Sequence, residues 1–541
     1  MPVTRFPLAL ERRFTRLARR KWLTILLVGL LSLASRALLL PILPIPQPAI
    51  QDEFSYLLAS DTFASGRLTN PTPAFADHFE TPQVLVRPTY ASKYPPLAGL
   101  VMALGQKLAG HPWVGVWLSS GALCAAICWA LQGWLPAPLA LLGALLALVK
   151  IGIVSYWSEG YWGGAYAGIG GALVIGAVPR LLRRRRSADA IAFASGIAIL
   201  ANTRPYEGLV LVLVCTAYLA AISVHRQTGI GRLAKSLALP MALVLIPVFA
   251  WMSYYNYRVA GDPLNMPYVT HDAQYAVWSP LLWQTHPAAE PRYSSRFLRD
   301  FWVLGDGREK QAAHAIPVKA HVSDLLDLGR FYLGWPLMLG MLALAYPLWR
   351  NPTARAALLL SAMFYVGIAF DVRLYPHYAA PATALIYVLA ACAFRSLRKA
   401  WPGRFAERVY LPWFLFGLFA VATLPGLHGS RYWFGPADFH VRAKRAAVTK
   451  QLEREPGGQL VLVRYGAQHD LFEELVYNPA DIDRSKIIWA RSLGPEKDRE
   501  LLRHYRGRRA WLLVEDGTVT LSRYAITGEE VVNASAGGPY Y

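Results

Sequence analysis

The feature that most constrains the fold is a series of apolar runs, each about 20 residues long, separated by short loops rich in Arg and Lys. A helix of about 20 apolar residues crosses a hydrocarbon core of roughly 30 Å. Of the 541 residues, 55% are hydrophobic and only 16% are charged, whereas a soluble protein carries roughly 25% charged residues. The chain is therefore predicted to be mainly α-helical and to cross a membrane many times.

The basic loops set the expected orientation, because cytoplasmic loops of membrane proteins carry an excess of Lys and Arg. With about eleven spans, all basic clusters, including the basic N-terminus, fall on the cytoplasmic side. The expected spans cover residues 22–44, 111–133, 138–157, 160–179, 188–203, 206–224, 236–256, 330–348, 354–370, 378–394 and 409–427. The net charge of +21 is thus assigned to membrane anchoring, and nucleic-acid binding is not expected.

Two outer loops, 45–110 and 257–328, and a C-terminal segment, 428–541, are expected on the opposite side. The apolar stretch 95–109 is too short to span and is expected to lie on the membrane. Strands are expected at 459–465, 486–491 and 509–515, with helices at 470–478 and 496–506. The domains are therefore a transmembrane domain, 1–427, and a small periplasmic α/β domain, 428–541.

Glycines are frequent in span 160–179, including Gly168, Gly170 and Gly171. Small residues let helices in a membrane approach one another closely. We interpret this run as a helix-packing surface.

An acidic pair, Asp52-Glu53, follows the first span by a few residues, and Glu159 lies in the tight turn between spans three and four. Carboxylates at a membrane boundary are costly to keep unless they have a function. Because burial raises a carboxyl pKa, such a group can act as a general base. The pair has a second interpretation as a helix cap, since acidic residues suit a helix N-terminus.

Cations are expected at the same face: Lys93 in the first outer loop, Arg204 between spans five and six, and Arg373 between spans nine and ten. His377 and Tyr378 follow in that last turn. Cations at this depth suit a phosphate, which Arg binds as a fork. Together with the carboxylates they favour transfer from a phosphate leaving group to a hydroxyl.

Structural interpretations of the same residues stay open. Lys93 can extend to lipid headgroups, Arg204 can pair with Glu207, and His377 can be a buried helix-end residue. A divalent metal is a further alternative, since Asp52, Glu53 and Glu159 offer oxygen ligands. The sequence indicates no other cofactor.

The acidic pair, the large outer loop and the segment Lys93-Tyr94-Pro95-Pro96 before a short helix resemble the GT-C glycosyltransferases. The resemblance is to bacterial relatives of protein O-mannosyltransferases and lipid A aminoarabinose transferases. That family carries an Asp-Glu pair and a Lys-Pro-Pro or His-Pro-Pro motif, into which this chain inserts Tyr94.

The resemblance implies transfer of a sugar, with inversion, from a polyprenyl-phosphate donor to a glycan, lipid or protein acceptor. It implies that Asp52 is the base or acceptor-binding carboxylate, that Glu53 supports it, and that Glu159 is a second acid by position. It also implies the periplasmic face of a bacterial inner membrane. A transporter or flippase of lipid-linked glycans is the alternative, although the sequence shows no internal repeat typical of transporters.

Overall fold

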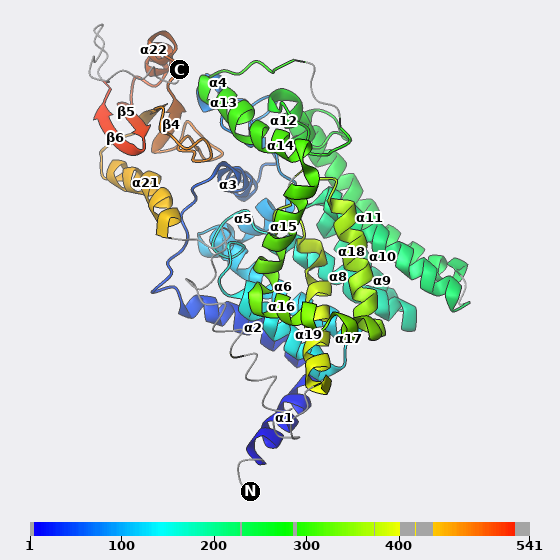
Figure 1. Cartoon of the computed structure of the whole chain (residues 1–541). Coiled ribbons are helices and arrows are strands. Elements are labelled where there is room, and N and C mark those ends of the chain that lie inside the picture. The colour runs from blue at the N-terminus through cyan, green and yellow to red at the C-terminus, as the bar shows by residue number, and fades with distance from the viewer. Residues whose placement is uncertain are drawn as a thin grey trace.

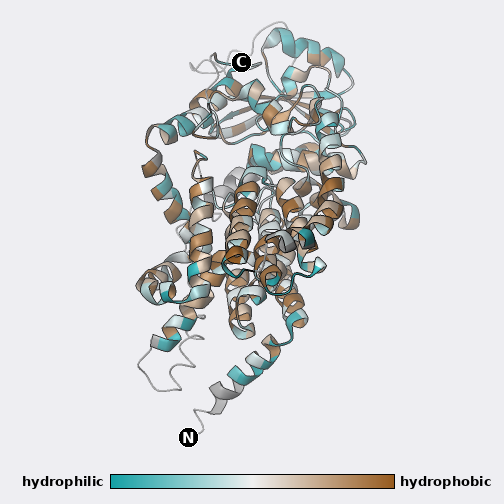
Figure 2. Cartoon of the chain, turned by 90° about the vertical axis from the view of Figure 1, so that its right-hand side faces the viewer, coloured by the Kyte–Doolittle hydropathy of each residue, from teal (hydrophilic) through white to brown (hydrophobic). Residues whose placement is uncertain are grey.

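The computed structural model describes residues 5–227, 230–284, 289–372, 374–400, 417 and 436–524. A body of packed helices carries the N-terminal helix α1 (Arg5–Ala18) at one end and the C-terminal strands at the other (Figure 1). Apolar residues gather in the helices of the body, and hydrophilic residues dominate both ends (Figure 2). This distribution is the one that a membrane-embedded bundle requires.

Six of the described helices are long and apolar enough to cross a membrane. They are α2 (Lys21–Leu38), α6 (Trp113–Trp134), α8 (Ala165–Arg183), α10 (Pro205–His225), α11 (Ile230–Ala260) and α19 (Thr383–Ala400). Shorter apolar helices lie at further expected spans: α7 (Ala137–Ala147) with its π-helical continuation η1 (Leu148–Gly152), α9 (Ser187–Ala201) and α18 (Pro352–Ile368). The span expected at 409–427 lies outside the described residues.

The span expected at 330–348 differs from the structure. It is divided among α15 (Pro317–Tyr332), α16 (Gly334–Ala343) and α17 (Ala345–Arg350). α16 begins at Gly334, whose φ of 69° is a left-handed conformation that glycine adopts without strain and that breaks the continuous helix. Hydropathy does not reveal this break, because the residues before and after Gly334 are similarly apolar.

The two loops predicted from the sequence contain helices of their own. The first loop folds into α3 (Gln51–Ala64), α4 (Ala76–Phe79), the short strands β1 (Val84–Leu85) and β2 (Ala91–Ser92), and α5 (Leu97–Ala109). The second contains α12 (Pro267–Tyr275), α13 (Arg296–Asp300), the π-helix η2 (Phe301–Gly305) and α14 (Asp306–Ala315). α3 lies between the helical body and the C-terminal strands (Figure 1).

The C-terminal part forms the predicted α/β unit. Its elements are α21 (Pro436–Glu453), β3 (Gln459–Tyr465), β4 (Ile487–Arg491), α22 (Pro495–His504), β5 (Arg509–Asp516) and β6 (Thr518–Arg523). The strand order is β4-β3-β5-β6, with β4, β3 and β5 parallel and β6 antiparallel to β5. The predicted strands are therefore confirmed.

The prediction of a helix at 470–478 is wrong, because a turn and an isolated β-bridge at 471–473 are followed by irregular backbone. The Glu474 carboxylate accepts hydrogen bonds from the N–H groups of Leu475 and Val476, at 2.9 and 2.8 Å. The Asn478 amide pairs with both backbone groups of Trp489 in β4, at 2.7 and 2.9 Å. Glu474 thus satisfies N–H groups that a helix would pair internally, and Asn478 ties the segment to β4. We call residues 473–480 the strap.

Glycines in α8 allow the close packing expected from the sequence. A Cβ added at Gly171 would lie 1.9 Å from the carbonyl oxygen of Pro381, in the 3-10 turn η3 (Ala380–Ala382). A Cβ at Gly170 would lie 3.0 Å from the Gly196 oxygen in α9. α8 therefore approaches both neighbours too closely for any side chain.

Gly171→Ala should destabilise the bundle by about 1–3 kcal/mol, because the methyl group forces α8 away from Pro381. Thermal unfolding of the detergent-solubilised protein measures this. Gly340→Ala in α16 is the matched control, since a Cβ there meets nothing within 4 Å. Equal unfolding temperatures for the two variants would contradict the packing argument.

Candidate functional site

The N-terminus of α3 is held by Glu53, which is fully buried. Its Oε2 accepts hydrogen bonds from the N–H groups of Ala49 and Ile50, at 2.9 and 3.4 Å. Its Oε1 accepts one from the N–H of Tyr161, at 3.1 Å. Glu53 thus caps the helix and ties it to the turn between η1 and α8.

Asp52, one residue earlier, has a different environment. The hydroxyl of Tyr94 donates a very short hydrogen bond to Asp52 Oδ1. The Tyr94 ring stacks on Tyr56 of the same helix, with ring centroids 4.4 Å apart. The residue inserted into the Lys-Pro-Pro motif is therefore a direct partner of the candidate base.

The pKa of Asp52 is raised above its ordinary value by burial, although the Tyr94 hydrogen bond and two cations act in the opposite direction. The cations are Lys93 and Arg204. A buried carboxylate with a raised pKa is a better proton acceptor than a solvated one. Of the acidic pair, Asp52 therefore has the environment expected of a proton acceptor.

The two cations approach from different elements. Lys93 Nζ lies 3.6 Å from Asp272 Oδ1 in α12 and 5.7 Å from the ring centre of Trp302 in η2. Arg204 precedes α10, where its guanidinium lies 3.7 Å from Glu207 and 4.6 Å from the ring centre of Tyr378. Both ion pairs are longer than a hydrogen bond, so these cations are only loosely engaged.

A backbone hydrogen bond brings the two cationic segments together. The N–H of Leu97, which begins α5, donates to the carbonyl of Asn202 at 3.1 Å. The motif that ends at Pro96 therefore lies against the turn that carries Arg204. This explains how residues far apart in the sequence surround Asp52.

His377 is buried beside Tyr378, with ring centroids 4.7 Å apart, and its Nδ1 lies 2.8 Å from the Tyr156 hydroxyl. Burial, reinforced by the charge of Arg204, holds the pKa of His377 well below its ordinary value. The imidazole is therefore neutral near pH 7. The His377 ring packs against the ring of Tyr378 and supports it. Arg373 lies outside the described residues.

Glu159 is paired with a residue that the sequence analysis overlooked. Arg36 in α2 donates to both carboxylate oxygens, at 2.5 and 3.0 Å, and its guanidinium also lies 4.8 Å from the ring centre of Trp113. Arg36 is 1% exposed. One signal was available in the sequence: Arg36 is the only cation in the first apolar run. A charged residue inside a membrane span usually has a buried partner of opposite charge.

The metal site suggested by Asp52, Glu53 and Glu159 is not supported by these partners. Backbone N–H groups occupy the Glu53 oxygens, and Arg36 occupies those of Glu159. In the described part of the chain, no group of three or more His, Cys, Asp or Glu side chains is placed to hold a metal ion.

The second loop supplies charged residues that no motif announced. His271 Nδ1 lies 3.2 Å from Asp272 Oδ1, and Lys310 lies 2.8 Å from Asp306 in α14. Burial alone would raise the pKa of Asp272, but Lys93, His271 and Lys310 hold it below its ordinary value. Asp272 thus stays ionised beside Lys93, a placement that only the folded chain reveals.

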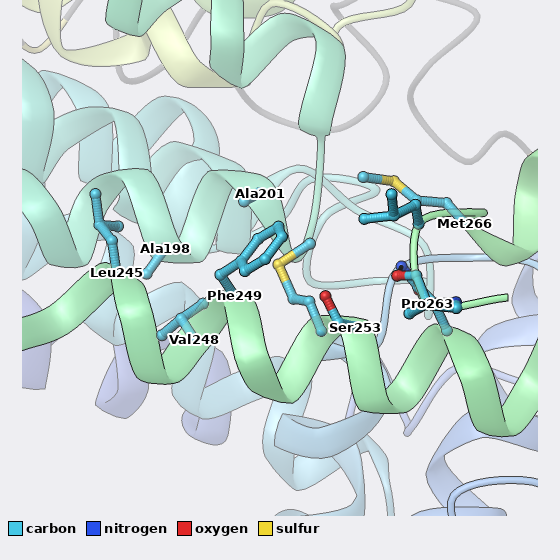
Figure 3. A pocket seen from close by; sticks show the side chains of 11 residues that line it. Ala198, Ala201, Leu245, Val248, Phe249, Ser253, Pro263 and Met266 are labelled. Atoms are coloured by element: carbon cyan, nitrogen blue, oxygen red, sulfur yellow. Dashed lines mark hydrogen bonds between the residues drawn. The ribbon is translucent and has the colours of Figure 1, made fainter. Parts of the chain in front are cut away.

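An apolar cavity of about 270 Å³ lies between the C-terminal end of α9, the second half of α11 and the turn at 263–266. Figure 3 shows side chains of α11 along one side of it, with Pro263 and Met266 towards one end. Phe249 lines it and is 63% exposed, so the cavity opens on the outer surface of the bundle. Ala201, also in the lining, is three residues from Arg204.

Comparisons with known proteins identify the fold. No model of a known protein family matches the chain, and no curated protein sequence matches it. Solved structures do match, and what they share with this chain is the fold.

One such structure is ArnT from Cupriavidus metallidurans bound to undecaprenyl phosphate, with a TM-score of 0.50 and 15% identity over 91% of this chain and 92% of that one. The apo form of that ArnT gives a TM-score of 0.47, with 15% identity over 90% and 92% of the two chains. An oligosaccharyltransferase from Archaeoglobus fulgidus in complex with Zn and sulfate gives 0.40, with 13% identity over 80% of this chain and 55% of that one.

Removing the Tyr94 hydroxyl should raise the pKa of Asp52. A hydrogen bond to a charged group contributes about 1.5–3 kcal/mol, equivalent to about 1–2 pH units. In Tyr94→Phe, the carboxylic acid band of Asp52 in infrared difference spectra should persist to a correspondingly higher pH. Tyr161→Phe is the control, because its hydroxyl donates to Pro46. An unchanged midpoint in Tyr94→Phe would contradict the assignment.

Removing Arg36 should destabilise the protein. Arg36→Met leaves the buried Glu159 without its cation, and breaking one partner of a buried pair costs about 3–5 kcal/mol. The double variant Arg36→Met, Glu159→Met should lose less than the sum of the two single variants. Thermal unfolding in detergent measures this coupling, and strictly additive losses would refute it.

Proposed function

We propose that this protein is a glycosyltransferase that transfers a sugar from a polyprenyl-phosphate donor to an acceptor hydroxyl. The observation that carries the proposal is a partly buried carboxylate, Asp52, flanked by two cations, one from the loop before α5 and one from the turn before α10. A base and an anion site next to one another are what this transfer requires. The GT-C fold agrees with the proposal, and the ArnT structure of that fold was solved with undecaprenyl phosphate bound.

In the proposed reaction, Asp52 accepts the proton of the acceptor hydroxyl as its oxygen attacks the anomeric carbon. The bond between that carbon and the phosphate oxygen breaks, and the lipid phosphate leaves with the electron pair. Lys93 and Arg204 stabilise the negative charge that develops on the phosphate. Attack from the side opposite the phosphate inverts the anomeric centre.

The remaining predicted residues receive supporting roles in this proposal. Glu53 fixes the start of α3, and Glu159 with Arg36 fixes the neighbouring turn. Tyr378 lies beneath Arg204 and is supported by His377. Arg373 is assigned to the phosphate by its position in the sequence.

The apolar cavity beside α11 is proposed to hold the first isoprene units of the donor. It opens at the exposed side chain of Phe249 and is lined by residues close to Arg204 in the sequence. A lipid chain can thus remain in the bilayer while its phosphate reaches the cations. This arrangement favours a lipid-linked donor over a soluble nucleotide sugar.

The basic N-terminal helix α1 and the α3 end of the bundle lie at opposite ends (Figure 1). The charge pattern of the loops assigns α1 to the cytoplasm. We therefore propose that Asp52 and the C-terminal α/β unit face the periplasm of a bacterial inner membrane. The acceptor is a glycan, lipid or protein hydroxyl on that side.

Asp52→Asn should lower kcat by about 10²–10⁴-fold, the contribution of a general base. Release of polyprenyl phosphate from supplied polyprenyl-phosphate sugars measures the turnover. Asp189→Asn, at the start of α9, is the matched control and should keep its activity. Movement of lipid-linked sugars across vesicles without any release would favour a transporter, and near-normal turnover in Asp52→Asn would remove Asp52 from the mechanism.

A further inference from the structure

α3 presents different faces to different parts of the protein. Asp52 and Tyr56, one helical turn apart, face Tyr94. Ile50, Phe54 and Asp61 recur at a helical spacing and contact the C-terminal unit. The orientation of the candidate base is therefore linked to what lies on the other face of its helix.

The strap follows α3 along its length. At the start of the helix, Ile50 forms an antiparallel bridge with Glu473. In the first turn, Phe54 stacks on Tyr477, with ring centroids 4.7 Å apart. In the last turn, Asp61 Oδ2 accepts a hydrogen bond from the N–H of Ala480 at 2.7 Å.

These three contacts constrain different movements of the helix. The Ile50 bridge and the Asp61 hydrogen bond hold its two ends, and so restrict sliding and tilting. The stacked Phe54 ring restricts rotation about the helix axis. Phe54 is fully buried, so that its ring has no alternative position in solvent.

The strap is itself anchored to the α/β unit. Arg445 of α21 donates hydrogen bonds to the carbonyls of Leu475 and Tyr477, at 3.1 and 3.0 Å. Its guanidinium also lies 5.4 Å from the ring centre of Phe54 and 4.5 Å from that of Trp489 in β4. One cation thus joins the sheet, the strap and the catalytic helix.

A buried ion pair fixes the start of the strap. Glu474 lies 2.8 Å from Arg491 of β4 and accepts a hydrogen bond from the Thr81 hydroxyl at 2.8 Å. Glu474 and Arg491 are both 2% exposed. Thr81 belongs to the same loop as α3, so that the α/β unit holds this loop at a second place.

We propose that the C-terminal α/β unit positions the catalytic helix, with Tyr477 and Arg445 as positioning residues that act on Asp52 through Phe54. The chemistry that this serves is the transfer proposed above. Neither residue is assigned a contact with substrate in this proposal. A misplacement of about 1 Å at a reacting group can lower a rate about 10²-fold, so a small rotation of α3 is sufficient to abolish efficient transfer.

The test compares substitutions of one strap residue in the full-length protein. Tyr477→Ala removes the ring that holds Phe54, and should lower kcat at least tenfold while the KM for the donor changes less than twofold. Tyr477→Phe keeps the ring and should restore kcat. Trp511→Ala, in β5 of the same unit, is the matched control for general destabilisation, because Trp511 bonds to Gln459 within the sheet.

A second measurement does not depend on turnover. Hydrogen–deuterium exchange of the α3 amides should rise in Tyr477→Ala and stay unchanged in Tyr477→Phe and Trp511→Ala. Should Tyr477→Ala fail to fold, Asp61→Ala removes the contact with Ala480 and should show the same rise. Unchanged exchange and unchanged kcat in a folded strap variant would overturn the inference.

The two proposals fail separately in this design. Absence of turnover in the unmodified protein, with exchange rising as expected, would reject the transferase and keep the mechanical link. Turnover in the unmodified protein that survives in Tyr477→Ala would reject the link and keep the transferase.

Discussion

The structure depends on how carboxylates are stabilised where the protein meets the membrane. An ionised carboxylate withdrawn from water needs hydrogen bonds or an opposite charge. The three acids at the α3 end of the bundle meet this need differently. Glu53 receives backbone N–H groups, Glu159 receives Arg36, and Asp52 receives one tyrosine hydroxyl and two more distant cations. We assign proton transfer to the last of these carboxylates, whose pKa burial raises.

This difference distinguishes the acids that hold the proposed site in place from the acid that is proposed to react. The fully satisfied acids fix the start of α3 and the turn before α8. The cations near Asp52 are paired at 3.6 and 3.7 Å, distances that an incoming phosphate can replace with shorter bonds. Preorganised supporting groups around less saturated reactive groups are what electrostatic catalysis requires.

Much of this architecture was predictable, because membrane spans and sheet strands follow from local hydropathy. The long apolar helices α2, α6, α8, α10 and α11 and the strands of the C-terminal unit were found in this way. The gathering of Asp52, Lys93 and Arg204 was also predictable, since topology placed their loops on one face. The bonds made by side chains of the strap were not predictable. Its residue pattern resembled a helix, but Glu474 binds the strap's own N–H groups and Asn478 binds the backbone of β4.

Contacts between distant segments were the other limit. The Tyr94 hydroxyl was recognised only as an insertion into a motif, although it bonds directly to Asp52. Asp272 and Lys310 lie in a loop with no motif, and Arg36 is one polar letter in an apolar run. The role of each depends on a contact with a residue far away in the sequence, and a single sequence does not show which distant residues are in contact.

The strap also has a consequence for the order of events during biosynthesis. Chains are made from the N-terminus, and domains generally fold as they emerge. α3 leaves the ribosome early, but the segment that holds it, 473–480, follows about four hundred residues later. The protein therefore inserts its spans before its candidate base is held in place. On the proposed link between the strap and Asp52, a nascent chain gains transfer activity only after the α/β unit has folded.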